Sequence, residues 1–230
     1  IQPTDLNTFH MYPKGYQGSK NTVADRERNT YPGSANNFWG GFRQESEPWL
    51  NSEFGGVAAF DGDYDVSWCF KYQTDIQRQY EKLNGYVYTE PYDIEYERNG
   101  VLTYDRRDKI FGYEDVAYGG DMSIIDLNQP NYVGVDIDPA LKAAPGSQYT
   151  APVVAMNWSG ETLENPVLKW RFDATDIYGN YITTGKSGEV PMDFAPYTRE
   201  QHDISFSLPS QKCVGTFTVW IENNGEKIAK

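Results

Sequence analysis

A carboxylate at the end of an apolar segment is the first feature of this sequence that could do chemistry. Trp49 and Leu50 lead into Glu53, and Gly55 and Gly56 follow almost at once. A buried parallel strand that presents a reactive residue at its carboxyl end and then turns away has this pattern. A carboxylate there is costly unless it is paired or used, so Glu53 is a candidate catalytic residue. The alternative interpretation is a glutamate that caps the next helix or pairs with an arginine.

Two segments carry the most specific pattern. Residues 48–56 read Pro-Trp-Leu-Asn-Ser-Glu-Phe-Gly-Gly, and residues 85–106 read Gly-Tyr-Val-Tyr-Thr-Glu-Pro-Tyr-Asp-Ile-Glu-Tyr-Glu-Arg-Asn-Gly-Val-Leu-Thr-Tyr-Asp-Arg. Together they resemble the last strands of the catalytic barrel of glycoside hydrolase family 2, the family of β-galactosidases, β-glucuronidases and β-mannosidases. The resemblance extends over about residues 5–115. It implies a retaining, exo-acting β-glycosidase that is most similar to a β-galactosidase.

The resemblance also implies roles for individual side chains. Glu53 matches the nucleophile of the family. Tyr12 matches a tyrosine that hydrogen-bonds the nucleophile and holds it ionised, and His10, two residues earlier, would point toward the sugar. The structural alternative for Tyr12 is a core tyrosine with a satisfied hydroxyl.

Tyr88 and Glu90 follow the segment that resembles the eighth barrel strand. Related enzymes usually place a tryptophan here as a floor for the sugar, and this chain departs from that pattern. We expect both residues to contribute to substrate binding, with Glu90 accepting a hydrogen bond from a sugar hydroxyl. The alternative for Glu90 is a pair with an arginine such as Arg106.

The proton donor of the family is a glutamate directly after an asparagine, well upstream of the nucleophile. No Asn-Glu pair occurs in the 230 residues, and the only glutamates before Glu53 lie in polar sequence with no strand leading to them: Glu27, Glu45 and Glu47. Retaining hydrolysis needs two carboxyl groups roughly 5–5.5 Å apart. We therefore expect that this chain alone is inactive. It would need the remainder of a parent chain, or a second copy, to complete the barrel.

The elements expected around these residues form the end of a (β/α)8 TIM barrel over residues 1–118. Strands are expected at 5–12, 48–53 and 85–89, an amphipathic helix at 64–83, and a last helix at about 108–118. Residues 13–47 are rich in Gly, Asn, Ser and Arg and are expected to form a long loop with at most one helical turn. A whole barrel has eight strands in about 250 residues, so these elements would be a part of one.

The second half of the chain has a different pattern. Residues 119–146 are expected to be a linker, and residues 147–230 an immunoglobulin-like antiparallel β-sandwich, because apolar residues alternate with a period of two between turn sequences. The alternation predicts four inward side chains: Trp170, Phe172, Phe217 and Val219. The pair Asn224-Gly225 predicts a tight hairpin near the end of the chain.

Composition excludes several classes of function. The net charge is −13 and the pI is about 4.5, which disfavours binding to nucleic acid or to an anionic membrane. The sequence has no apolar run of about 18 residues, so no membrane span is expected. Two cysteines and two histidines give no metal-ligand cluster, and no cofactor is expected. Aromatic residues make up 15%, which suits sugar stacking and a β-rich core equally.

The sequence leaves several questions open. Asn157-Trp158-Ser159 fits a glycosylation sequon, although such triplets arise often by chance. The compartment is open, although glycan-degrading enzymes of this kind are often periplasmic or secreted. The sugar and its linkage are open too. The alternative function is a non-catalytic, carbohydrate-associated sandwich module that carries a barrel remnant.

Overall fold

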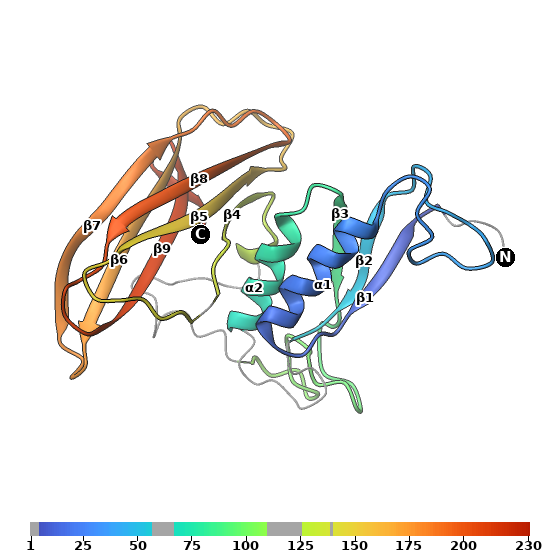
Figure 1. Ribbon diagram of the computed structural model, residues 1–230, viewed down its shortest axis with the longest axis horizontal. Helices are drawn as coiled ribbons and strands as arrows, with labels where there is room; N and C mark the ends of the chain where they lie inside the picture. The colour runs from blue at the N-terminus through green and yellow to red at the C-terminus, as the bar shows by residue number, and fades with distance from the viewer. Residues whose placement is uncertain (1–4, 57–66, 110–125, 139) are drawn as a thin grey trace. The chain divides into compact units, whose positions relative to one another are not determined.

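The computed structural model describes residues 5–56, 67–109, 126–138 and 140–230. The chain divides into two compact units, Ile1–Ile110 and Phe111–Lys230 (Figure 1). The first unit is a three-stranded sheet with two helices, and the second consists of two antiparallel sheets. None of the described helices is long and apolar enough to cross a membrane.

The first unit is a β-α-β-α-β sequence. Its elements are β1 (Asn7–Met11), α1 (Gly15–Asn29), β2 (Trp49–Phe54), α2 (Ser67–Arg78) and β3 (Leu83–Tyr88). The three strands are parallel, in the order β1-β2-β3, so each helix is a crossover between neighbouring strands. The structure of this unit does not show the predicted partial TIM barrel, because its described strands form a single three-stranded sheet.

The core of the first unit lies between the sheet and the helices. Buried side chains come from β1, β2 and both helices: Phe9, Met11, Val23, Trp49, Phe54, Tyr72 and Ile76. The rings of Phe9 and Trp49 stack with centroids 5.0 Å apart across the β1–β2 pair. The predicted strands are confirmed to within two residues at most ends, and α2 lies inside the predicted helix. The expected helix at 108–118 falls almost entirely outside the described residues.

The prediction of a long loop over residues 13–47 is wrong for residues 15–29 and holds for residues 30–47, which contain no helix or strand. Helix α1 occupies Gly15–Asn29 and buries only Ser19 and Val23, so the sequence lacks the apolar stripe by which helices are recognised. It contacts α2 through polar and aromatic side chains as well as through Val23. Gln73 Nε2 donates to Ser19 Oγ at 3.3 Å, and the Tyr16 ring meets the edge of Tyr72 at 5.1 Å. Tertiary contacts of this kind stabilise a helix that propensity alone does not predict.

The second unit has seven strands in two antiparallel sheets, which fit a β-sandwich (Figure 1). One sheet has the order β4-β5-β8, with β4 at Asn131–Val135, β5 at Gln148–Asn157 and β8 at Thr198–Ser207. The other has the order β10-β9-β6-β7, with β6 at Pro166–Asp176, β7 at Tyr181–Pro191, β9 at Cys213–Asn223 and β10 at Glu226–Ala229. A short 3-10 helix, η1 (Asp126–Asn128), precedes β4. Strand β4 lies within residues 119–146, where only a linker was expected.

The inward side chains of the sandwich are those that the alternation predicts. Phe172 and Val219 are buried, and Trp170 and Phe217 are half-buried against the same core. Phe206, from the opposite sheet, stacks on Trp170 at 5.5 Å and on Phe217 at 5.3 Å between ring centroids. The core is therefore shared between the two sheets, as a sandwich requires.

The predicted hairpin at the end of the chain is also confirmed. Asn224 and Gly225 have φ angles of 52° and 82°, and they join β9 to β10 with Asn223 opposite Glu226. Two consecutive positive φ angles are the conformation of a type I′ turn, which glycine and asparagine adopt most easily.

Candidate active site at the carboxyl end of the parallel sheet

The carboxyl ends of β1 and β2 bring the first candidate residues together. Because the strands are parallel neighbours, their carboxyl ends share one edge of the sheet. Glu53 is the second-last residue of β2, His10 is the second-last residue of β1, and Tyr12 directly follows β1. Glu53 therefore lies on the central strand of the three, with a candidate partner on the adjacent strand.

A register shift in β2 sets the direction of Glu53. Phe9 pairs with Asn51 and His10 pairs with Glu53, so Ser52 is an extra residue relative to β1. Its hydroxyl donates to the Phe9 carbonyl at 3.4 Å. An extra residue of this kind interrupts the alternation of side chains and re-aims the one that follows. Phe54 thus returns to the buried side, and Glu53 turns toward the other.

Tyr12 and Glu53 are joined by a direct hydrogen bond. The phenol of Tyr12 donates to Oε1 of Glu53 at 2.9 Å. Burial, and then the hydrogen bond to the Glu53 carboxylate, raise the pKa of Tyr12 above its ordinary value. The phenol is therefore a neutral donor over the whole physiological range, and it stabilises negative charge on Glu53. The contact expected between these two residues is present.

His10 lies against the same carboxylate from the solvent side. Its Nδ1 is 3.5 Å from Oε1 of Glu53, and the two side chains are 60% and 33% exposed. A polar contact this exposed contributes little to stability. The imidazole therefore adds a second polar group beside Glu53 that a ligand at this edge can reach.

Gly55 allows the site to close tightly behind Glu53. A Cβ at this position would lie 2.8 Å from Cγ of Asn99 and 2.9 Å from Cε1 of Tyr12, closer than carbon atoms approach one another. Asn99 belongs to the segment that follows β3, so three parts of the chain meet at this glycine. The absence of a side chain here is what allows Tyr12 to reach Glu53.

Tyr88, at the end of β3, is part of the packing. Its ring meets Phe70 and Phe54 edge-on at 4.5 and 5.2 Å between centroids, and its hydroxyl donates to the Asn99 carbonyl at 2.5 Å. Its polar atom is thus already engaged with the backbone. The structure places Tyr88 beside the end of β2, but its ring is held by aromatic neighbours.

Glu90 has an unsatisfied oxygen. Its Oε1 is buried and has no hydrogen-bond partner among the described residues. Burial raises the pKa of Glu90, and the negative charges of Glu97, Asp93 and Glu53 raise it further. Arg106, the partner considered in the alternative interpretation, instead places its guanidinium 3.5 Å from the centre of the Tyr92 ring.

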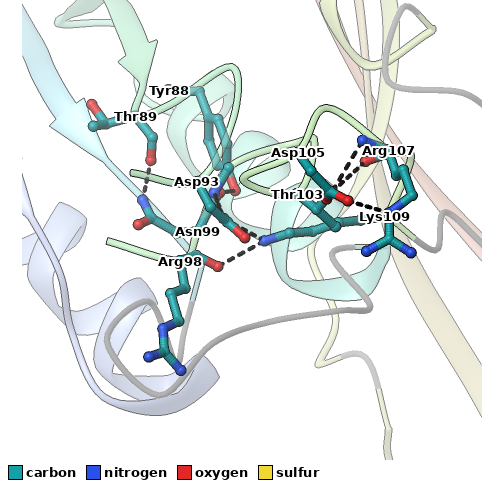
Figure 2. A network of polar contacts seen from close by, with 10 residues as sticks. Tyr88, Thr89, Asp93, Arg98, Asn99, Thr103, Asp105, Arg107 and Lys109 are labelled. Carbon is teal, nitrogen blue, oxygen red and sulfur yellow. Dashed lines mark hydrogen bonds and ion pairs between the residues drawn. The ribbon is translucent and has the colours of Figure 1, made fainter. Parts of the chain in front are cut away.

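The segment that carries Glu90 is held by a buried ion pair (Figure 2). Lys109 is 2% exposed, and its ammonium donates to Oδ1 of Asp93 and to the Arg98 carbonyl, both at 2.7 Å. The Gly100 amide donates to the same carboxylate oxygen at 2.9 Å. In Figure 2 the Asn99 side chain points to the Thr89 carbonyl, to which its amide donates. These contacts fix the course of residues 90–109 beside the end of β3.

Sequence reasoning did not select Glu97, which is close enough for its charge to raise the pKa values of both Tyr12 and Glu90. It is one acidic residue in a polar segment, so no local pattern marks it. Within the described residues there is no group of three or more His, Cys, Asp or Glu side chains that could hold a metal ion. The chemistry available at this edge is that of carboxylates with one phenol donor and one imidazole.

Comparison with known proteins adds little to this geometry. No family model and no curated protein matches the chain. Among solved structures, a β-glucuronidase from Bacteroides uniformis is similar at a TM-score of 0.34 and 12% identity, over 89% of this chain and 26% of that one. A provisionally assigned β-galactosidase from Bacteroides fragilis has a TM-score of 0.31 and 11% identity, over 90% of this chain and 32% of that one. The chain thus spans about a quarter to a third of their length, and scores this low carry no argument about activity.

Proposed function

We propose that this chain is the C-terminal portion of a retaining, exo-acting β-glycosidase of glycoside hydrolase family 2, most similar to a β-galactosidase. In this proposal the first unit supplies the last strands of a (β/α)8 barrel, and the second unit is an immunoglobulin-like sandwich that follows it. The observation that carries the proposal is the hydrogen bond of 2.9 Å from Tyr12 to Glu53 at the carboxyl edge of the parallel sheet.

Glu53 is the nucleophile of the proposed reaction. Its carboxylate attacks the anomeric carbon, the bond from that carbon to the leaving oxygen breaks, and a covalent glycosyl-enzyme forms. Water then attacks the same carbon and releases Glu53, so the configuration is retained overall. Tyr12 holds the attacking oxygen in place and stabilises its charge before attack, which is the geometry that nucleophilic catalysis requires.

The remaining candidates contribute to substrate binding in this proposal. His10 is exposed beside Glu53 and presents a ring nitrogen to a sugar hydroxyl. Glu90 is half-buried, and its carboxyl group, whose Oε1 has no partner among the described residues, is suited to accept a hydrogen bond from another hydroxyl. Tyr88 takes part through its ring, because its hydroxyl is bound to Asn99.

The leaving oxygen needs a proton from a second carboxyl group. No residue of this chain is assigned that role, so we propose that the group belongs to the barrel strands that precede these residues in a parent protein. General acid assistance typically contributes about 10²–10⁴-fold. The 230-residue chain alone should therefore hydrolyse nitrophenyl β-glycosides at no useful rate.

The test is covalent labelling followed by kinetics. A parent protein that contains this chain is treated with fluorinated mechanism-based β-glycosides, and mass spectrometry identifies the labelled peptide, which should contain Glu53. Glu53→Gln should abolish labelling and turnover, whereas Glu27→Gln, a change in α1 at a glutamate that pairs with Lys82, should change neither. Tyr12→Phe should lower kcat by about 10–100-fold, the value of one hydrogen bond to a charged group.

Two results would contradict the proposal. Full activity of the Glu53→Gln parent would exclude the nucleophile assignment. Normal turnover by the isolated chain would show that these residues contain their own proton donor.

A further inference from the structure

A hollow of about 260 Å³ lies in the second unit, lined by residues that the proposed function does not use. It is bounded by residues 182–186 of β7, by Ser207 at the end of β8 and by residues 208–211, which lead from β8 to β9. Strand β7 ends the four-stranded sheet and β8 ends the three-stranded sheet, as Figure 1 shows. The hollow therefore opens where the edges of the two sheets meet.

The polar lining of this hollow consists of donors and carries no acidic residue, although the whole chain has a net charge of −13. It is made of four hydroxyl groups, one amide and one ammonium: Thr183, Thr184, Ser207, Ser210, Gln211 and Lys186. A lining of this composition within so acidic a chain favours an anionic ligand, because ammonium, hydroxyl and amide groups all donate to oxyanions.

The environment of Lys186 is the main evidence for an anionic ligand. Its side chain is half-buried, and it forms no ion pair with the part of the chain that the structure describes. By contrast, Lys169 on the outer face of the same sheet binds Glu222 at 2.6 Å. An ammonium beside the hollow with no carboxylate paired to it within the described residues can donate to an anion bound there.

Neighbouring hydrogen bonds leave donors available. Ser207 Oγ accepts from Gln148 Nε2 at 2.8 Å, so its own proton can be donated to a ligand. Thr184 Oγ1 is committed, because it donates to the Phe172 carbonyl. The available protons therefore come from both sides of the hollow, with Lys186 on β7 and Ser207 on β8.

The rest of the lining is apolar. Ile182 and Leu208 also pack against the core of the sandwich, and Pro209 completes this part of the wall. Rigid aliphatic surface beside a set of donors suits a ring that has both C–H and polar groups. A single sugar ring has that character, and its size matches the hollow.

We propose that this hollow binds one sugar unit that carries an oxyanion, either a carboxylate or a sulfate ester. Lys186 and Ser207 bind the oxyanion, and Ile182 and Leu208 contact the ring. The proposal concerns the sandwich alone, and it holds whether or not Glu53 is catalytic.

The test is binding to the complete 230-residue chain at low ionic strength, measured by isothermal titration calorimetry and amide NMR shifts. The ligands are galactose 6-sulfate, galacturonate, neutral galactose and inorganic sulfate. We expect both charged sugars to bind at least tenfold more tightly than galactose, and more tightly than sulfate alone. Their affinity should fall with added salt, because the contact is ionic.

Matched lysine variants locate the site. Lys186→Gln should weaken both charged sugars by about tenfold or more, the loss of one charge-assisted hydrogen bond. Lys169→Gln should leave binding unchanged, and near-ultraviolet circular dichroism should show that both variants keep the packing of Trp170. Equal binding of neutral galactose, or an unchanged affinity in Lys186→Gln, would overturn the proposal. If inorganic sulfate bound as tightly as the charged sugars, the proposed contact of the sugar ring with Ile182 and Leu208 would be overturned.

Discussion

Replacing Lys109 by methionine should release the segment that carries Glu90. The side chain of Lys109 is 2% exposed, and its ammonium makes two contacts of 2.7 Å, one with Oδ1 of Asp93 and one with the Arg98 carbonyl. Methionine fills similar space but makes neither contact. Asp93 would keep only the Gly100 amide, at 2.9 Å.

The size of the effect follows from this burial. Removing one partner of a buried ion pair costs about 3–5 kcal/mol, because the other charge stays buried without compensation. Asp93 is 16% exposed, so water can reach it in part, and we expect the lower end, about 3 kcal/mol. That value corresponds to more than a hundredfold increase in the population of locally open states.

Hydrogen exchange with mass spectrometry measures this locally. Peptides over residues 91–103 should exchange more than a hundredfold faster in Lys109→Met, while peptides from β6 in the other unit serve as an internal reference. Lys82→Met is the matched control, since Lys82 is 46% exposed and 3.4 Å from Glu27 Oε1, and it should change exchange less than threefold. Unchanged protection of residues 91–103 in Lys109→Met would refute the reasoning that this pair holds the segment.

Three further predictions concern stability. The pKa of Tyr12 is raised in the folded chain, so above about pH 10 the unfolded state loses a proton that the folded state keeps. The free energy of unfolding should therefore fall between pH 9 and 11, and it should fall less steeply in Tyr12→Phe than in the unsubstituted chain. Urea titrations followed by hydrogen exchange of β1 would measure the two slopes. Asn157→Ala should destabilise the sandwich by about 3 kcal/mol or more in thermal unfolding. The fully buried side-chain amide of Asn157 donates to three carbonyls and accepts from the Ser159 amide and the Ser159 hydroxyl. A loss no larger than in Asn180→Ala would contradict this. Gly215→Ala should cost about 1–3 kcal/mol in the same assay, because the added methyl group would overlap the Phe172 ring, and an unchanged midpoint would mean that the ring can move aside.

The elements that could be predicted from the sequence are those whose side chains alternate or repeat. The sandwich strands follow the period of two closely, as β6 does with Leu168, Trp170 and Phe172 on its inner side. Strand β4 could not be found in this way, because three consecutive residues, Tyr132 to Gly134, are buried and no alternation remains.

The candidate site was predictable in part. The Glu53 segment ends a strand, and the proximity of Tyr12 follows from parallel pairing once the strands are placed. The extra residue in β2 leaves no mark in the sequence, because Ser52 is an ordinary strand residue. The charge of Glu97 beside Tyr12 could not be inferred either, since it depends on the course of residues 90–109. The sequon at Asn157 is misleading for a physical reason, as its side-chain nitrogen is buried and donates to three carbonyls.

The register shift in β2 also bears on how this edge of the sheet can change over generations. In an uninterrupted strand of the same length, Glu53 would share the side of Trp49 and Asn51, and Phe54 would leave the core. Losing the single codon for Ser52 would instead keep both side chains on their present sides, because Glu53 would still pair with His10 and Phe54 with Met11. The extra residue is therefore needed only while the strand keeps its full length. Among homologues, a gap at this position would be compatible with an unchanged site, whereas a substitution of Glu53 would not.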